Sequence, residues 1–221
     1  MTHEVGAQTV LLGPSTKEEI KRVTVGLLLR HGYQGLRFRD IADTLHITRA
    51  NIHHHYGSKL NLCEEVIADY VKATLSNWSA NWMGPGTLAE KIEGMMEANR
   101  ARYLAFNRGG NTANPWSLIG RMRLERDIIG PRARQALIDF GVTLDRLVLH
   151  GVSQAIEKGE LSRDAPRDAI ALQLVAVADS AGFITQDGGD FRRLEQLYRS
   201  ISLIVHQAYG TRSSSNRSFE T

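Results

Sequence analysis

A run of polar and basic side chains between residues 48 and 59 contains the residue types that contact DNA. Arginine can donate two hydrogen bonds to one guanine, and asparagine can pair in the same way with adenine. Lysine, threonine and tyrosine commonly contact phosphates. The candidate DNA-binding residues are Thr48, Arg49, Asn51, His53, His54, Tyr56 and Lys59. Their chemistry favours nucleic-acid binding over catalysis.

Positive charge is concentrated around these residues. The formal charge of the whole chain is only +3, which alone does not indicate a nucleic-acid partner. Between Ser15 and Leu60, however, eight Lys and Arg residues outnumber four Asp and Glu residues, and five His residues add to them. A local positive field attracts polyanions. The DNA-binding part is therefore predicted to lie in this segment.

Two short helices would position the candidate residues. Apolar residues recur at i, i+3, i+4 and i+7 from Phe38 to Leu45, which predicts a helix of about two turns. A second short helix is predicted from Thr48 to Tyr56. The connection between them is so short that the helices must cross sharply. This arrangement is a helix-turn-helix, whose second helix enters the major groove of DNA.

The segment RFRDIADTLHITRANIHHHYGSKLNL resembles the DNA-binding region of the TetR family of repressors. The similarity covers roughly Lys17 to Tyr70 and includes Gly32-Tyr33, Asp40-Ile41-Ala42 and the closing run His55-Tyr56-Gly57-Ser58-Lys59. The resemblance implies an all-α fold, with an N-terminal three-helix DNA-binding domain joined to a larger helical ligand-binding and dimerisation domain. It also implies a double-stranded DNA operator as partner.

Two positions depart from the family pattern. His46 occupies the turn where the family commonly has Gly, so we expect a left-handed backbone there, which His tolerates better than most residues. Leu36-Arg37 stands where the family often has a Ser or Thr cap before the second helix. Both departures affect the details of the turn and the cap.

Other interpretations of the DNA-binding residues remain open. Three consecutive histidines, at 53–55, point about 100° apart on a helix and do not converge on one metal ion, so no metal site is predicted. Tyr56 lies four residues after Ile52 and fits the core as well as a DNA contact. Arg37 fits a solvated helix start, and Arg49 could also be a solvated side chain. No cofactor site and no catalytic pair is predicted, so the chain is not expected to be an enzyme.

The remainder of the chain has helical periodicity without strand-like alternation. Residues 1–14 are predicted to form a flexible arm, 15–60 the DNA-binding domain, 61–209 the helical ligand-binding and dimerisation domain, and 210–221 a disordered tail. The first helix is predicted to begin in a capping box at Ser15. Further helices are expected at about 58–82, from residue 87, and at 116–129, 131–158, 166–186 and 190–209.

The composition of the last two predicted helices indicates that they pack closely against other helices. The segment 169–184 is apolar nearly all round and rich in small residues, and apolar residues recur at helical spacing from Leu194 to Ala208. The resemblance implies that these helices pair with their copies in a homodimer, and small residues permit such close approach. Burial of both helices within one subunit is the alternative.

Aromatic, methionine and arginine side chains of the body could line a cavity for a small-molecule inducer. The candidates are Trp82, Met96, Arg100, Tyr103, Trp116, Arg121, Met122, Phe140 and Phe183. Such residues at helical spacing are also typical of an ordinary core. Arg100 and Arg121 would suit an anionic ligand if they faced inward. The ligand itself is not predicted by the sequence.

The expected function is a dimeric transcriptional regulator, a repressor released from a palindromic operator by an inducer. A constitutive chromosome-associated or cell-division factor on the same scaffold is the alternative. Cys63 is the only cysteine, which fits a reducing cytosol. No export signal or membrane span is predicted, because Gln173 and Asp179 interrupt the most apolar segment. A cytoplasmic location without a membrane partner is therefore expected.

Overall fold

The computed structural model describes residues 16–109 and 112–211. Within these ranges the chain forms nine helices and no strand beyond an isolated bridge between Leu161 and Gly210. The all-α prediction is confirmed. The predicted cap at Ser15, the arm 1–14 and nearly all of the tail lie outside the described residues. The helices are α1 (Thr16–Gly35), α2 (Phe38–Leu45), α3 (Arg49–Tyr56), α4 (Lys59–Met83), α5 (Leu88–Phe106), α6 (Leu118–Leu124), α7 (Pro131–Glu157), α8 (Arg167–Gly188) and α9 (Arg192–Tyr209).

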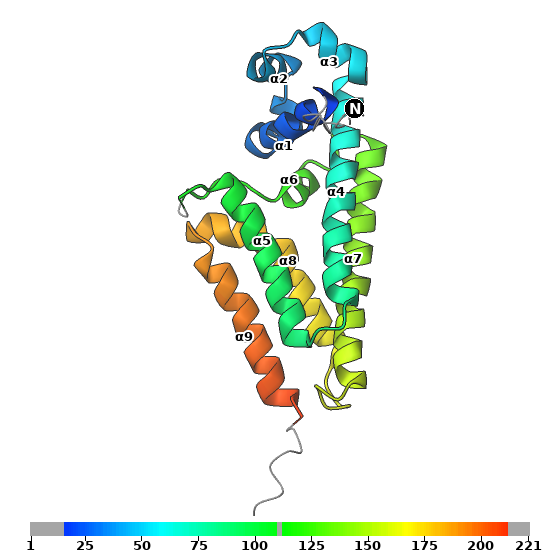
Figure 1. The fold of residues 1–221 in the computed structure, drawn as a ribbon, viewed down its shortest axis with the longest axis vertical. Helices are drawn as coiled ribbons and strands as arrows, with labels where there is room; N and C mark the ends of the chain where they lie inside the picture. The colour runs from blue at the N-terminus through cyan, green and yellow to red at the C-terminus, as the bar shows by residue number, and fades with distance from the viewer. Residues whose placement is uncertain (1–15, 110–111, 212–221) are drawn as a thin grey trace, which may run out of the picture.

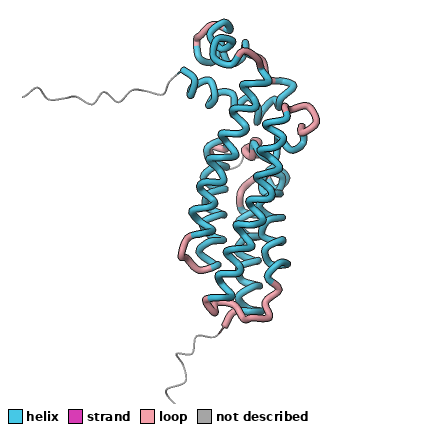
Figure 2. The backbone as a smooth tube through the Cα atoms, turned by 90° about the vertical axis from the view of Figure 1, so that its right-hand side faces the viewer, coloured by secondary structure: helices cyan, strands magenta, loops and turns pink. Residues whose placement is uncertain are grey.

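The first three helices form a head at one end of an elongated molecule (Figure 1). Each contributes an apolar side to a shared core, and the residues that meet there are fully buried: Ile20, Leu28, Ile41 and Ile52. The helix α4 begins in this head and continues far into the body, as Figure 2 shows from the side. The head is therefore joined to the body by a continuous helix.

The longest helices, α4 and α7, run side by side in the same direction. Near their starts, Glu64 accepts a hydrogen bond from the Arg132 backbone N–H at 2.8 Å. Near their ends, Trp82 covers Gly151, where a Cβ atom would lie only 2.4 Å from the indole ring. Glycine at 151 permits this close approach, and overpacking such a contact is destabilising. The pair forms the backbone of the body.

The predicted helix 116–129 is wrong in extent, because α6 ends at Leu124. Ser117 caps its start by accepting a hydrogen bond from the Gly120 N–H at 3.2 Å. After Leu124 the chain turns, which buries Ile129 and brings Pro131 to the start of α7 beside α4. Tertiary packing overrides the helical periodicity of this stretch.

Gly32 interrupts α1 with a non-helical backbone. Its φ of 68° is left-handed, and one further helical turn follows to Gly35. A Cβ on Gly32 would lie 2.0 Å from Oε1 of Glu125, so both the backbone conformation and the neighbour require glycine. The end of α1 thus packs directly against the segment that follows α6.

The helix α8 is long and apolar enough to span a membrane by length and composition alone. The core helix of a soluble protein passes the same test. Here α8 packs against α7 and α9, with buried residues such as Ile170, Leu174 and Ala181 along it. Its apolar character therefore has an explanation in the packing of the body.

Candidate nucleic-acid interface and ligand cavity

The turn between α2 and α3 has the geometry expected from the sequence. His46 has φ 54° and ψ 39°, which confirms the left-handed backbone predicted there. Arg37 precedes α2 without a side-chain cap. Thr48 caps α3, because its hydroxyl oxygen accepts a hydrogen bond from the Asn51 backbone N–H at 3.2 Å. This turn sets α3 across the outer end of the head.

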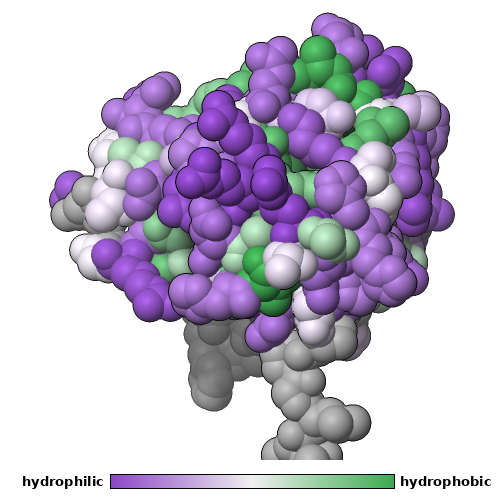
Figure 3. All heavy atoms as spheres, turned by 90° about the horizontal axis from the view of Figure 1, so that it is seen from above, coloured by the Kyte–Doolittle hydropathy of each residue, from purple (hydrophilic) through white to green (hydrophobic). Residues whose placement is uncertain are grey.

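The helix α3 has one buried side and one exposed side. Ile52 and Tyr56, four residues apart, are buried against the head. Apart from Ala50, the exposed residues from 48 to 56 are polar: Thr48, Arg49, Asn51, His53, His54 and His55. Seen from the end that carries the head, the surface is mostly hydrophilic (Figure 3). The arrangement leaves a polar helix edge open to a partner.

His53 is held in one orientation at this edge. Its ring packs edge-on against Phe38, with ring centroids 4.7 Å apart. Its Nδ1 lies 3.0 Å from the Gly57 carbonyl oxygen. A carbonyl oxygen can only accept, so the bond assigns a proton to Nδ1 and leaves Nε2 for another contact. His53 is thus an exposed but oriented side chain.

Tyr56 is a core residue in the structure. Its hydroxyl donates a hydrogen bond to the Lys17 carbonyl oxygen at 3.1 Å, and its ring lies beneath the Lys17 ammonium group. Burial, together with the negative charge of Glu65, raises the pKa of Tyr56 to about 12. The placement favours the core interpretation that the sequence left open.

Lys59 has a structural role that sequence analysis did not predict. Its ammonium group donates hydrogen bonds to the carbonyl oxygens of Tyr33 at 2.9 Å, Leu36 at 3.3 Å and Gln34 at 3.4 Å. It also lies 4.6 Å from the centre of the Tyr33 ring. The last carbonyls of a helix lack partners within it. Lys59 therefore binds the end of α1 to the start of α4, and its phosphate contact stays a prediction.

Two further lysines attach α1 to α4. Lys17 and Lys21 each lie 2.8 Å from Glu65, and Lys21 lies 2.6 Å from Asp69. Burial lowers the pKa of Lys21, but its bonds with Asp69 and Glu65 outweigh burial, so the pKa is raised. These lysines are neutralised by acids of α4. The exposed positive charge of the head is carried mainly by arginines.

The arginines of the head differ in their partners. Arg39 forms an exposed ion pair with Asp43 at 3.4 Å. Arg37 and Arg49 are exposed and have no acidic partner among the described residues. An unpaired guanidinium at the start of α3 is free to form two parallel hydrogen bonds with a base edge. Arg49 is thus the best-placed candidate for base recognition.

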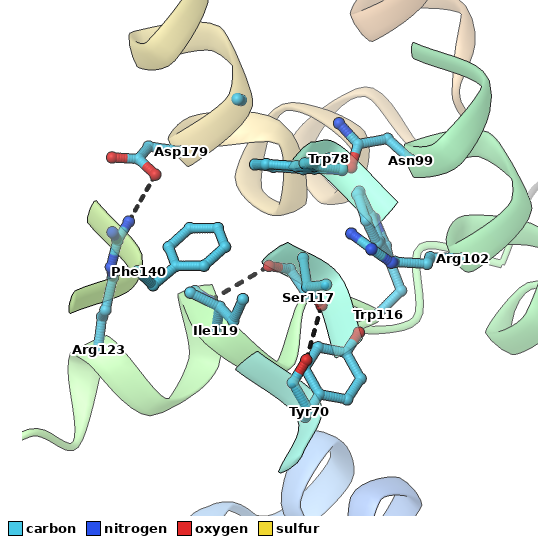
Figure 4. Close-up of a pocket in the computed structure, with 13 residues that line it drawn as sticks. Tyr70, Trp78, Asn99, Arg102, Trp116, Ser117, Ile119, Arg123, Phe140 and Asp179 are labelled. Carbon is cyan, nitrogen blue, oxygen red and sulfur yellow. Dashed lines mark hydrogen bonds and ion pairs between the residues drawn. The ribbon is translucent and has the colours of Figure 1, made fainter. Parts of the chain in front are cut away.

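The body contains a partly open cavity with two adjoining chambers. The inner chamber has a volume of about 20 Å³ and is bordered by α4, α5, α6, α7 and α8 (Figure 4). The outer chamber has a volume of about 140 Å³ and lies between α6 and α8. Trp116, Ser117, Gly120 and Asp179 border both chambers. The two spaces can therefore accept different parts of one molecule.

The structure divides the predicted ligand-binding residues into two groups. Trp116 borders both chambers, Phe140 the inner one, and Arg121 and Phe183 the outer one. The other candidates border neither chamber: Trp82, Met96, Tyr103 and Met122 are buried in the core, and Arg100 forms an ion pair with Glu195. Helical periodicity identifies inward faces but not which inward side chains border empty space.

Sequence analysis missed most of the residues that border the inner chamber, among them Tyr70, Trp78, Asn99, Arg102 and Asp179. A usable signal was present in α4. Tyr70, Thr74 and Trp78 are spaced four residues apart, which places them along one helix face. This row of side chains forms one wall of the inner chamber.

Comparison with known proteins agrees with this geometry. Residues 20–66 match the family model described as bacterial regulatory proteins of the tetR family. The HTH-type transcriptional repressor AcnR of Corynebacterium glutamicum is 25% identical over 173 residues, which are 78% of this chain and 81% of AcnR. The match to AcnR extends well beyond the helix-turn-helix.

Solved structures share the whole fold. A TetR transcriptional regulator from Chloroflexus aurantiacus gives a TM-score of 0.72 at 17% identity, covering 89% of this chain and 97% of that one. A protein from Saccharomonospora viridis, crystallised in complex with choline, gives 0.68 at 20% identity, covering 89% and 98%. At these identities the comparison establishes the fold.

The fold and the exposed edge of α3 are those of a helix-turn-helix protein. The similar sequences are those of bacterial regulators of transcription. Residues 20–66 match the TetR family of bacterial regulatory proteins, and the chain as a whole is similar to a repressor with a helix-turn-helix. The family resemblance of the sequence is thereby confirmed.

The contacts of Lys59 predict a stability effect independent of DNA. Lys59→Met should lower the free energy of unfolding by about 1–3 kcal/mol, because three carbonyl oxygens lose a charged donor. Urea unfolding without DNA measures this loss. Lys72→Met, at an exposed position of the same helix, is the control and should have little effect. Equal stability of the two variants would contradict the role of Lys59.

Proposed function

We propose that this protein is a dimeric repressor that holds a palindromic operator with α3 of each subunit and releases it when a small molecule fills the cavity of the body. The observation that carries the proposal is the exposed polar edge of α3, which presents Arg49, Asn51 and His53 outward. Its dimensions suit a major groove, which admits one α-helix.

The exposed residues of α3 are assigned different roles. Arg49 would contact a guanine through two hydrogen bonds, since it has no acidic partner in the described part of the chain. Asn51 and the oriented ring of His53 would contact neighbouring base edges. His54 would reach the phosphates or the groove wall. Thr48 contributes to this interface chiefly as the cap of α3.

An exposed apolar surface on α8 and α9 supports dimerisation. Leu172, Phe183, Leu203 and Ile204 are between 45% and 68% exposed. Apolar residues gathered on neighbouring helices mark an interaction site in a soluble protein. A second copy packed on this surface would form the four-helix interface implied by the family. Two α3 helices would then face successive major grooves, about 34–36 Å apart.

Two connections would carry a ligand signal from the cavity to the head. The first is α4, which borders the inner chamber with Tyr70 and reaches the head at Lys59. The second is Glu125, which follows α6 and accepts a hydrogen bond from the Tyr33 backbone N–H at 2.6 Å. Movement of α4 or α6 around a ligand would therefore shift the head. Such coupling is a shift between two populations of the dimer.

Two similar proteins support the two parts of this proposal, repression and the binding of a small molecule. AcnR is named a transcriptional repressor, and the Saccharomonospora viridis protein holds a small molecule on the same fold. The repressor relative favours regulated repression over a constitutive chromosome-associated role. A cytoplasmic location follows from the proposed contact with chromosomal operators.

Arg49→Ala tests the recognition helix. We expect the affinity for an operator selected by the wild-type protein to fall by about 5- to 150-fold, because a two-bond contact with guanine is worth about 1–3 kcal/mol. Base preference should relax at one position in each half-site. Fluorescence anisotropy with a set of single-base operator variants measures both effects.

The matched control is Arg146→Ala, which removes the same charge from an exposed position of α7 in the body. Its affinity and base preference should equal those of the wild type. If Arg49→Ala retains full affinity and base preference, α3 is not the recognition helix and the proposal fails.

Ile204→Glu tests the dimer surface. Ile204 is 62% exposed on α9, and a charge buried in an apolar interface is strongly unfavourable. We expect the mass in solution, measured by light scattering, to fall from that of a dimer to that of a single 24.6 kDa chain. The control is Val142→Glu, at an exposed apolar position of α7. The control should remain a dimer. If Ile204→Glu also keeps the mass of a dimer, the interface lies elsewhere.

A further inference from the structure

The inner chamber contains a cation that lacks an acidic partner. Arg102 projects from α5 toward the chamber (Figure 4) and is half-buried. Among the described residues, no Asp or Glu lies within ion-pair distance of it. The other arginine of the chamber, Arg123, is different, because it is bonded to Asp179 at 2.6 Å. Arg102 therefore has a free guanidinium facing a cavity.

The surroundings of Arg102 only partly compensate its charge. Its guanidinium lies 5.6 Å from the centre of the Trp78 ring, a favourable cation–π distance. Burial lowers the pKa of Arg102, although the nearby Tyr70 opposes this effect. Arginine nevertheless stays charged in proteins. A charge that is partly removed from water and lacks an acidic partner gains from a bound anion, so the site favours an anion.

Neutral hydrogen-bond donors border the same space. The indole Nε1 of Trp78 is buried and has no hydrogen-bond partner. Burial raises the pKa of Tyr70, so its hydroxyl stays protonated and can donate. The Ser117 oxygen accepts a bond from the Gly120 N–H, which leaves its own proton free. The chamber thus offers several donors beside Arg102, and the one carboxylate that borders it among the described residues, Asp179, is bonded to Arg123.

The two chambers suit the two parts of an amphipathic molecule. The inner chamber, at about 20 Å³, has room for a group the size of a carboxylate or one water molecule. The outer chamber, at about 140 Å³, is bordered by apolar side chains that include Trp116, Leu124 and Phe183. An apolar protein cavity of about 150 Å³ accepts benzene. The outer chamber therefore fits one aromatic ring or a short alkyl chain.

We propose that the effector of this protein is a small amphipathic carboxylate, with its carboxylate on Arg102 in the inner chamber and its apolar body in the outer chamber. This inference rests on the proposed function, because it names the ligand class of the same cavity. A planar guanidinium and a carboxylate match through two parallel hydrogen bonds. A cation such as the choline bound by the Saccharomonospora viridis protein would be repelled by Arg102.

The test compares acids with uncharged amides of the same shape, without DNA. The probes are 3-phenylpropanoate and hexanoate with their amides, and choline. Calorimetry and the fluorescence of Trp78 and Trp116 report binding. We expect each acid to bind at least about tenfold more tightly than its amide, because hydrogen bonds to charged groups are the stronger ones. Choline should not bind.

Variants assign the effect to Arg102. Arg102→Gln should remove the preference for acids, and Arg102→Lys should retain part of it. Arg126→Gln, at an exposed arginine that borders neither chamber, should keep the full preference. Circular dichroism and Tm show whether each variant is folded. If Arg102→Gln does not fold, the comparison of acids with amides in the wild type decides the question.

The inference is overturned if no acid binds, if acids and amides bind equally, or if folded Arg102→Gln keeps the preference for acids. These results differ from a failure of the proposed function. A protein that binds its operator through α3 but ignores every acid refutes only the ligand class. A protein that binds no DNA refutes the proposed function, whether or not acids bind.

Discussion

The structure depends on one helix that belongs to both parts of the molecule. At its start, Lys59 of α4 binds the last carbonyl oxygens of α1, and six residues later Glu65 binds two lysines of α1. Further along, Tyr70 and Trp78 of the same helix border the inner chamber. A continuous helix of 25 residues transmits displacement along its axis because its backbone hydrogen bonds make it stiff. Head and cavity are therefore mechanically linked through α4.

A second link limits how the head can move. Glu125 accepts a hydrogen bond from the Tyr33 N–H and forms an ion pair with Arg121 at 3.0 Å. Arg121 borders the outer chamber, so one carboxylate connects a cavity residue to the head. Gly32 is required there because any side chain would displace Glu125. In the proposed mechanism, a ligand that separates α6 from α4 would act on the head at two points. Two-point attachment converts a small local shift into a rotation.

Local sequence patterns predicted the helices of the head well, but they predicted the residues that border the cavity poorly. The spacing of apolar residues located α2 and α3, and the turn chemistry located the left-handed His46, because these features depend on residues close in sequence. Lys59 was expected at phosphates, but its partners in α1 lie more than 20 residues away. Tyr70 and Arg102 border the cavity through packing of five helices. The end of α6 at Leu124 is likewise set by tertiary contacts. Long-range packing decided the partners of Lys59, the residues that border the cavity and the end of α6.

In the proposed function, two copies of α3 are presented together to one duplex. Selection of bound sequences from a random pool of double-stranded DNA tests this claim most directly, since it assumes no operator and no ligand. We expect an inverted repeat whose half-site centres lie about 10–10.5 base pairs, or a multiple of that, apart. Enrichment of a single asymmetric site, or no enrichment over the starting pool, would contradict it.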